Sequence, residues 1–138
     1  MERTLVIIKP DAVQAGHIGE IISVYERAGL RIEYAHMAQL SVERASAFYA
    51  EHKGKDFYDG LIEFMTSGRC LILVVAGENA VARVRHLNGA TDPREAAEGT
   101  IRARFGSELP RNAVHASESL AAAEREIAFF FPGVSARG

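Results

Sequence analysis

The feature that most limits how this chain folds is an unbroken apolar run from Cys70 to Ala76. A short continuous run of this kind, bounded by polar or turn residues, predicts a fully buried β-strand. A second run, Thr4 to Ile8, is rich in β-branched residues and is stopped by Lys9-Pro10-Asp11. It predicts another buried strand, which ends in a polar loop.

The rest of the sequence alternates between helical and strand-like spacing. Ile18, Ile21 and Tyr25 recur at i, i+3 and i+7, the spacing of an amphipathic helix. The same reasoning predicts a helix from residue 18 to near Gly29 and a strand at 30–40. Ser41 is expected to cap a helix that carries Ala45, Phe48, Tyr49 and His52 on one face, and Asp59 a second helix that ends at Gly68. Further along, we expect a helix at 79–87, a strand at 114–117 and a helix at 119–130. Residues 88–112 form a long irregular stretch with one or two short helical turns, and stretches of this length are usually functional. This order predicts an α+β sandwich in which helices cover one antiparallel sheet.

Composition limits what such a fold binds. The chain has 138 residues, enough for a single domain with one core. Hydrophobic residues make up 48% and charged residues 25%, the balance of a soluble globular protein. The formal net charge is -2, so no overall positive field favours nucleic acids or anionic membranes. Any anionic ligand must therefore be held by a local group of side chains.

The sequence also bears on cellular location. Cys70 is the one cysteine, so it cannot form an intrachain disulfide, and we expect a buried thiol. The apolar residues at 5–8 are too few for a signal peptide. No stretch approaches the roughly 20 apolar residues of a membrane-spanning helix. We therefore expect a soluble, cytoplasmic protein without a membrane partner.

The segment most suggestive of chemistry is Asn112-Ala-Val-His115-Ala-Ser117, before the last predicted helix. On an extended backbone His115 and Ser117 lie on the same side, so we expect the hydroxyl to donate to whatever the imidazole attacks or carries. Glu126, about two turns into the next helix, is placed to take the proton of one ring nitrogen and leave the other as a nucleophile. A lone histidine in a strand is more often structural, so this interpretation depends on the surrounding residues.

Side chains able to hold phosphates occur at the ends of predicted elements and in the long irregular stretch. They are Lys9, Arg85, Thr91 and Arg102. The chain has no Gly-rich phosphate loop of the G-x-x-x-x-G-K-[ST] type, so a nucleotide would have to be held by such cationic and hydroxyl groups. Taken singly, each of these residues is more often a solvated surface charge or a turn residue than a ligand-binding one.

Four segments, in this order, resemble the successive motifs of nucleoside diphosphate kinases. They are Thr4-Leu-Val-Ile-Ile-Lys9-Pro-Asp11, Phe57-Tyr-Asp-Gly-Leu61, Gly99-Thr-Ile-Arg102 and Asn112-Ala-Val-His115-Ala-Ser117. The resemblance runs from about residue 3 to residue 131. It implies a ferredoxin-like βαββαβ core. It also implies ping-pong transfer of the γ-phosphate from a nucleoside triphosphate, typically ATP, to a nucleoside diphosphate through phosphorylated His115.

The resemblance implies a role for each matching residue. Lys9 and Asn112 would approach the ribose 3′-hydroxyl, with Lys9 also near the transferred phosphate. The other assignments are Arg85, Thr91 and Arg102 on the phosphate chain, Phe57 on the base, His52 on a phosphate as in some members only, and Tyr49, Ser117 and Glu126 in support of His115.

Mg²⁺ is the expected cofactor, bridging the nucleotide's own phosphates, because no cluster of side chains has the spacing of a protein metal site. One position departs from the family, which usually has aspartate where this chain has Glu118. The longer side chain keeps the charge near a helix N-terminus but changes its reach.

The expected partners are nucleoside di- and triphosphates and further copies of the chain. The brief tail at 132–138 resembles the short-tailed bacterial members, which are often tetramers. Two alternatives stay open: another phosphohistidine phosphotransferase, and a catalytically inactive interaction module of the same fold. The second is opposed by the intact residues Lys9, Arg85, Arg102, Asn112 and His115. General nucleic-acid binding is opposed by the acidic net charge.

Overall fold

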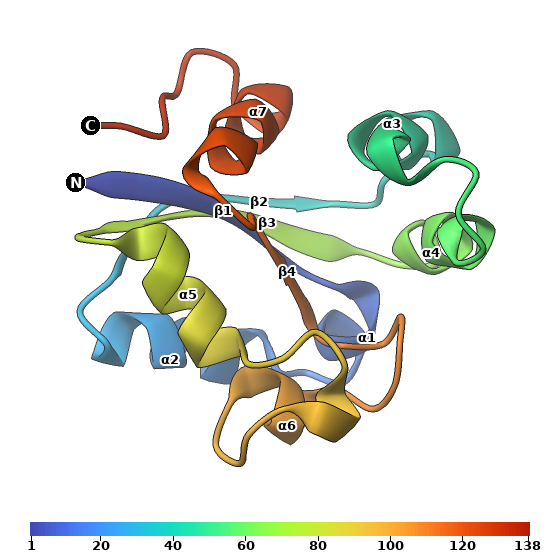
Figure 1. Ribbon diagram of the computed structural model, residues 1–138, viewed down its shortest axis with the longest axis horizontal. Coiled ribbons are helices and arrows are strands. Elements are labelled where there is room, and N and C mark those ends of the chain that lie inside the picture. Colours follow the sequence, from blue (N-terminus) through green and yellow to red (C-terminus); the bar gives the residue numbers. More distant parts are fainter.

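The computed structural model describes residues 1–138, and a four-stranded antiparallel sheet lies at its centre (Figure 1). The strands are β1 (Glu2–Ile8), β2 (Arg31–Ala38), β3 (Cys70–Gly77) and β4 (Val114–Ala116). Their order across the sheet is β2-β3-β1-β4. This is the order of a ferredoxin-like βαββαβ core, so the predicted fold class is confirmed.

The central position of β3 in the sheet explains why its sequence is apolar without interruption. It pairs with β1 on one side, where Leu5 lies opposite Val74, and with β2 on the other. All residues of β3 are buried, because helices cover both faces of the sheet at this strand. The predicted strands at 4–8 and 70–76 are therefore confirmed, and the buried Cys70 is a free thiol.

One face of the sheet is covered by α2 (Ile18–Arg27) and α5 (Ala80–Asn88), with α1 (Pro10–Gln14) and α6 (Ile101–Phe105) toward the same side. The other face packs against α7 (Leu120–Phe130), α3 (Val42–Phe48) and α4 (Tyr58–Met65). Val6 and Ile8 point to the first core, whereas Leu5 and Ile7 point to the second. This alternation is the two-residue period of a strand. None of the helices combines the length and apolar character needed to cross a membrane.

Most predicted boundaries agree with the structure, but two assignments around α4 were wrong. Asp59 does not cap this helix: Phe57 is the N-cap, and Asp59 lies in the first turn. Gly68 does not end it either, because the helix stops at Met65 and the Thr66 hydroxyl donates to the Ile62 carbonyl. In contrast, the Ser41 hydroxyl accepts from the backbone N–H of Arg44, as an N-cap should.

Two further predictions need correction. Lys9-Pro10-Asp11 does not form a loop; Pro10 opens α1, since proline suits the first helical position, where no N–H is needed. The helix predicted to carry both Ala45 and His52 is divided: α3 ends at Phe48, and a separate 3₁₀ turn, η1, covers Ala50–His52. The irregular stretch contains a second 3₁₀ turn, η2 (Pro93–Glu95), before α6.

Candidate active site

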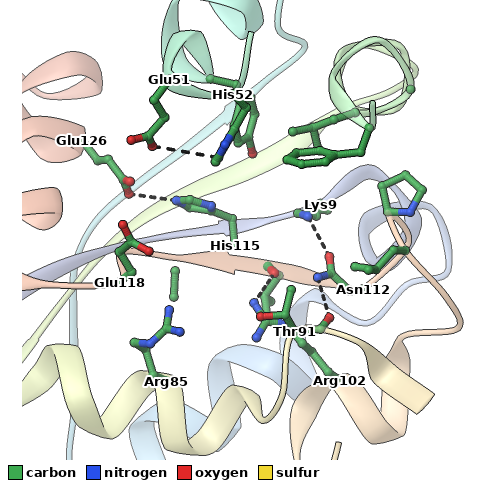
Figure 2. A pocket seen from close by; sticks show the side chains of 18 residues that line it. Lys9, Glu51, His52, Arg85, Thr91, Arg102, Asn112, His115, Glu118 and Glu126 are labelled. Carbon is green, nitrogen blue, oxygen red and sulfur yellow. Dashed lines mark hydrogen bonds and ion pairs between the residues drawn. The ribbon is translucent and has the colours of Figure 1, made fainter. Parts of the chain in front are cut away.

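A cleft of about 570 Å³ gathers the predicted site residues (Figure 2). With one exception, every such residue lines it. They are Lys9, Tyr49, His52, Phe57, Arg85, Thr91, Arg102, Asn112, His115 and Glu126. They come from the end of β1, the α3–α4 region, α5, the 89–112 segment, β4 and α7. The exception is Ser117.

His115 is held by the sheet and by α7. Its backbone pairs with Ile7 of β1, and its Nε2 lies 2.8 Å from Oε1 of Glu126 (Figure 2). A carboxylate acceptor at Nε2 keeps the ring proton there and leaves the lone pair on Nδ1. Nδ1 makes no hydrogen bond to the protein, so the ring offers one unengaged nitrogen to the cleft.

Glu126 is held as a carboxylate although it is only 7% exposed. Burial alone would raise the pKa of its carboxyl group, but the hydrogen bond and charge of His115, together with the Ser117 hydrogen bond, lower the pKa overall. An ionised group at this position stabilises the imidazole orientation and any positive charge that develops on the ring.

Ser117 lies on the same side of the chain as His115, as predicted, but its hydroxyl does not face the cleft. It is fully buried, donates to Oε1 of Glu126 at 2.9 Å and accepts from the N–H of Leu5 at 3.3 Å. The prediction that it donates to the group carried by the imidazole was wrong, because the nearer buried carboxylate takes this proton. Ser117 thus acts on His115 only through Glu126.

Aromatic rings surround the imidazole on the α3 side. Phe48 and Tyr49 both approach His115 edge-on, with ring centroids at 5.3 Å and 6.0 Å. The Tyr49 hydroxyl is buried without a partner, and burial raises its pKa, so Tyr49 supports the ring by packing and not by a hydrogen bond. Phe48 was missed as a site residue because its helical spacing indicates only a core position.

Lys9, Asn112 and Thr91 form a hydrogen-bonded row along one wall. The Lys9 ammonium donates to Oδ1 of Asn112 at 2.7 Å, and the Asn112 amide donates to the Thr91 carbonyl at 2.9 Å (Figure 2). Lys9 is 6% exposed. Burial, and then the charge of Arg102, lower its pKa to about 8. This cation therefore lies where an anionic ligand would stabilise it.

Arg102 and Arg85 add two more positive charges. Arg102 donates from Nη1 to the Gly89 carbonyl at 2.8 Å and from Nη2 to the Val114 carbonyl at 2.9 Å. Burial lowers the pKa of its guanidinium, Tyr25 opposes this change and Arg85 adds to it, and together they bring the pKa to about 10. Neither arginine has a carboxylate within ion-pair distance in the cleft. Three cations thus converge without neutralising partners, an arrangement that suits a polyanion.

The mouth of the cleft has apolar side chains in unusual exposure. Phe57 is 53% exposed and Leu109 is 51% exposed, and both line the same cleft. Phe57 was predicted to stack on a base, whereas Leu109 was missed. The sequence feature that could have identified Leu109 is an isolated leucine within a polar segment, where no neighbouring apolar residues form a core.

His52 and two carboxylates complete the lining. The His52 ring lies 5.3 Å from the Phe57 ring, and its Nε2 is 4.0 Å from Glu51. Figure 2 places Glu118 on the α7 side of the cleft, between Glu126 and Arg85. Glu51 was not predicted, since one acidic residue in a polar helix end is usually solvated.

A strained turn precedes the histidine. Ala113 has φ 71°, a sparsely populated backbone region that costs a non-glycine residue on the order of 1–3 kcal/mol. The Val114 N–H donates to the Asn112 carbonyl at 2.8 Å across it, which closes a γ-turn. Backbone strain of this kind clusters at functional sites.

Comparison with known proteins agrees with this geometry. The family model for nucleoside diphosphate kinase matches residues 2–135. The nucleoside diphosphate kinase of Chlamydia muridarum is 56% identical over 131 residues, which cover 95% of this chain and 93% of the relative.

Solved structures give the same result. The Aquifex aeolicus nucleoside diphosphate kinase superposes with a TM-score of 0.93 at 41% identity and covers 98% of both chains. The enzyme from Halobacterium salinarum, solved in complex with CDP, gives a TM-score of 0.91 at 46% identity and covers 94% of this chain and 87% of its own. With its sequence, fold and cleft all in agreement, the chain belongs to the nucleoside diphosphate kinase family of phosphotransferases.

Proposed function

We propose that the chain transfers a γ-phosphate between nucleotides through His115. The main support for this proposal is that Glu126 binds Nε2 of His115, while Nδ1 makes no hydrogen bond in a cleft lined by three cations. The Nδ1 lone pair attacks the γ-phosphorus of a nucleoside triphosphate as the bond to the β-phosphate oxygen breaks, and the diphosphate leaves. An oxygen of a second nucleoside diphosphate then attacks the phosphohistidine and restores the neutral ring.

The cations have a clear task in this scheme. In in-line phosphoryl transfer the protein mainly positions the reacting groups and neutralises negative charge on the equatorial oxygens of the phosphoryl group. Lys9, Arg85 and Arg102 supply that charge from three different elements. Mg²⁺ would be held by the nucleotide's own phosphates, whose negative charge it would partly neutralise. The Lys9–Asn112 pair supports a contact with the ribose 3′-hydroxyl, since both groups can exchange hydrogen bonds with it.

The apolar mouth supports broad base acceptance. Phe57 and Leu109 offer faces and no hydrogen-bonding edge, and stacking of roughly 1–3 kcal/mol is available to every base. The CDP bound by the Halobacterium salinarum relative is a pyrimidine nucleotide, which fits a cleft of this kind. His52, whose ring lies 5.3 Å from that of Phe57, is assigned to a phosphate contact only by the resemblance.

The two alternative functions are not favoured. A phosphohistidine enzyme that passes phosphate to water or to a protein would not require apolar residues at the mouth of the cleft. An inactive interaction module would not be expected to keep the hydrogen bonds between His115, Glu126 and Ser117.

We also infer the setting in which the enzyme works. We take the chain to be one nucleoside diphosphate kinase domain that acts in the cytoplasm as a homo-oligomer, and we expect a tetramer. An unpaired edge at β2, where Tyr34 and Met37 are exposed, supports association. Light scattering coupled to gel filtration gives the number of copies. The net charge of -2 argues against nucleic acid as a partner.

The testing experiment uses ATP labelled on the γ-phosphate, without acceptor. Acid-labile label should appear on His115, and adding an unlabelled nucleoside diphosphate should move the label into the triphosphate. The variant His115→Ala should fold, by circular dichroism, and show neither step, because no other residue of the cleft is a comparable nucleophile. Near-normal nucleotide exchange by this variant would overturn the mechanism.

A further inference from the structure

The β1–α1 corner holds the strained turn before His115 at several points. The Lys9 N–H donates to the Ala113 carbonyl at 2.8 Å, and Oδ2 of Asp11 accepts from the Ala113 N–H at 3.1 Å. The Lys9 side chain binds the neighbouring Asn112. Both backbone polar groups of Ala113 are thus engaged from this one corner.

The Asp11 carboxylate provides the acceptor for a backbone N–H that the turn itself leaves without one. In the γ-turn the Val114 N–H is used inside the turn, but the Ala113 N–H has no acceptor there, and Ala113 is fully buried. A buried N–H without an acceptor destabilises that conformation. Only two non-glycine residues of the chain have positive φ, and the other, Asn79, is of a type that tolerates it. Ala113 needs an external contact to stay in this conformation.

Burial of the Asp11 carboxylate is unfavourable, and the groups around it compensate only in part. Oδ1 of Asp11 is buried without a partner. Burial raises the pKa of the Asp11 carboxyl despite hydrogen bonds from the Ala113 and Ala12 backbone. Asp11 does not line the cleft, so substrate contact does not account for it.

We propose that Asp11 is a positioning residue that holds Ala113 in its positive-φ conformation and thereby fixes Asn112 and His115 relative to each other. Asn112 and His115 lie on opposite sides of this turn, so relaxation of Ala113 would move the amide row with Lys9 against the nucleophile. A misplacement of this kind lowers the rate of transfer more than it weakens nucleotide binding. The inference rests on the proposed role of His115.

The test compares Asp11→Ala, Asp11→Asn, Ala113→Gly and the double variant Asp11→Ala/Ala113→Gly. The measurement is single-turnover phosphorylation of His115 by saturating labelled ATP, with circular dichroism for folding. Asp11→Ala should phosphorylate on the order of tenfold to a hundredfold more slowly, with a much smaller change in nucleotide affinity. Asp11→Asn, which keeps an acceptor oxygen, should retain most of the rate.

Glycine at position 113 separates positioning from simple stabilisation. Glycine adopts positive φ without strain, so Ala113→Gly should make the rate far less sensitive to Asp11→Ala. The matched control is Glu2→Ala, which removes a similar carboxylate contact to a backbone N–H, that of Val81, far along β1 from Lys9; its phosphorylation rate should be unchanged.

Each outcome decides the matter. If Asp11→Ala folds only when Ala113 is replaced by glycine, the proposal is supported. If Asp11→Ala phosphorylates at the wild-type rate, or slows the reaction as much in the Ala113→Gly background as in the wild-type background, the proposal is overturned. Failure of the wild type to label His115 would instead refute the proposed function, and the two failures are therefore distinguishable.

Discussion

Nucleotide binding should be coupled to proton uptake by Lys9. Burial and the charge of Arg102 lower the pKa of this ammonium to about 8 in the free protein, so it is about half protonated at pH 8. A phosphate chain within a few ångströms favours the charged form. If the pKa returns toward the ordinary 10.5, forming the complex at pH 8 takes up about half a proton.

The sign of the pH dependence follows. The complex binds more protons than the free protein, so affinity falls as pH rises through 8. If binding restored the ordinary pKa of 10.5 from about 8 in the free protein, nucleotide affinity should weaken about tenfold between pH 7 and pH 9. The unliganded protein shows the opposite trend. Because the folded state binds fewer protons than the unfolded chain between these two values, its free energy of unfolding should rise with pH there.

Isothermal titration calorimetry measures the uptake directly. The Mg²⁺ complex of a nucleoside diphosphate is titrated into the protein at pH 8, in several buffers that differ in ionisation enthalpy. The slope of the observed binding enthalpy against the buffer's ionisation enthalpy gives the number of protons taken up. The nucleotide contributes little, since a terminal phosphate has its second pKa near 6.

Lys9→Arg is the matched control, because a guanidinium keeps its proton at pH 8. Its complex should form without this proton uptake. The Met1 amine, which lies 3.8 Å from Glu78, is present in both proteins and cancels in the comparison. Zero uptake by the wild type, or equal uptake by both proteins, would refute the reasoning.

Three further predictions concern the reaction. Glu126→Gln keeps an acceptor for His115 and Ser117 but loses the charge that strengthens these bonds, so phosphorylation should slow about tenfold. Glu126→Ala leaves the donors of His115 and Ser117 without their acceptor and should slow it about a hundredfold or more. Equal single-turnover rates for the two variants would contradict this. Removing the 3′-hydroxyl of ATP should lower the saturating rate of His115 phosphorylation more than the affinity, because Lys9 and Asn112 couple sugar position to phosphate position; equal saturating rates would rule out that role. Steady-state assays should find purine and pyrimidine diphosphates to be acceptors of similar efficiency, and a preference of about a thousandfold would require a base contact beyond stacking.

The parts of the fold that sequence predicts well are those decided by local pattern. The strand at 70–76 is apolar throughout because both its faces are covered, and the Ser41 cap depends only on a side chain that contacts its own helix. The predictions that failed depend on neighbours in space. Whether Asp59 or Phe57 begins α4 depends on the preceding turn, where the Tyr58 N–H binds the Lys55 carbonyl.

The candidate site shows the same division. Residues in the motif segments gather in one cleft, although their roles stay predictions. Phe48 and Glu51 escaped notice because their sequence signals are those of a core aromatic residue and a solvated charge. The direction of the Ser117 hydroxyl could not be read from strand alternation, which gives the side of the chain but not the acceptor that lies there.

The position of the candidate nucleophile is set more by its neighbours than by its own strand. β4 has three residues and pairs only with β1, too little to hold a strand by itself. Arg102 adds a hydrogen bond to the Val114 carbonyl, directly before His115, and a second to Gly89, one residue beyond α5. The same guanidinium lines the cleft. A phosphate bound by Arg102 would therefore act on the strand that carries His115, so the proposed phosphate binding and the placement of the candidate nucleophile share one set of contacts.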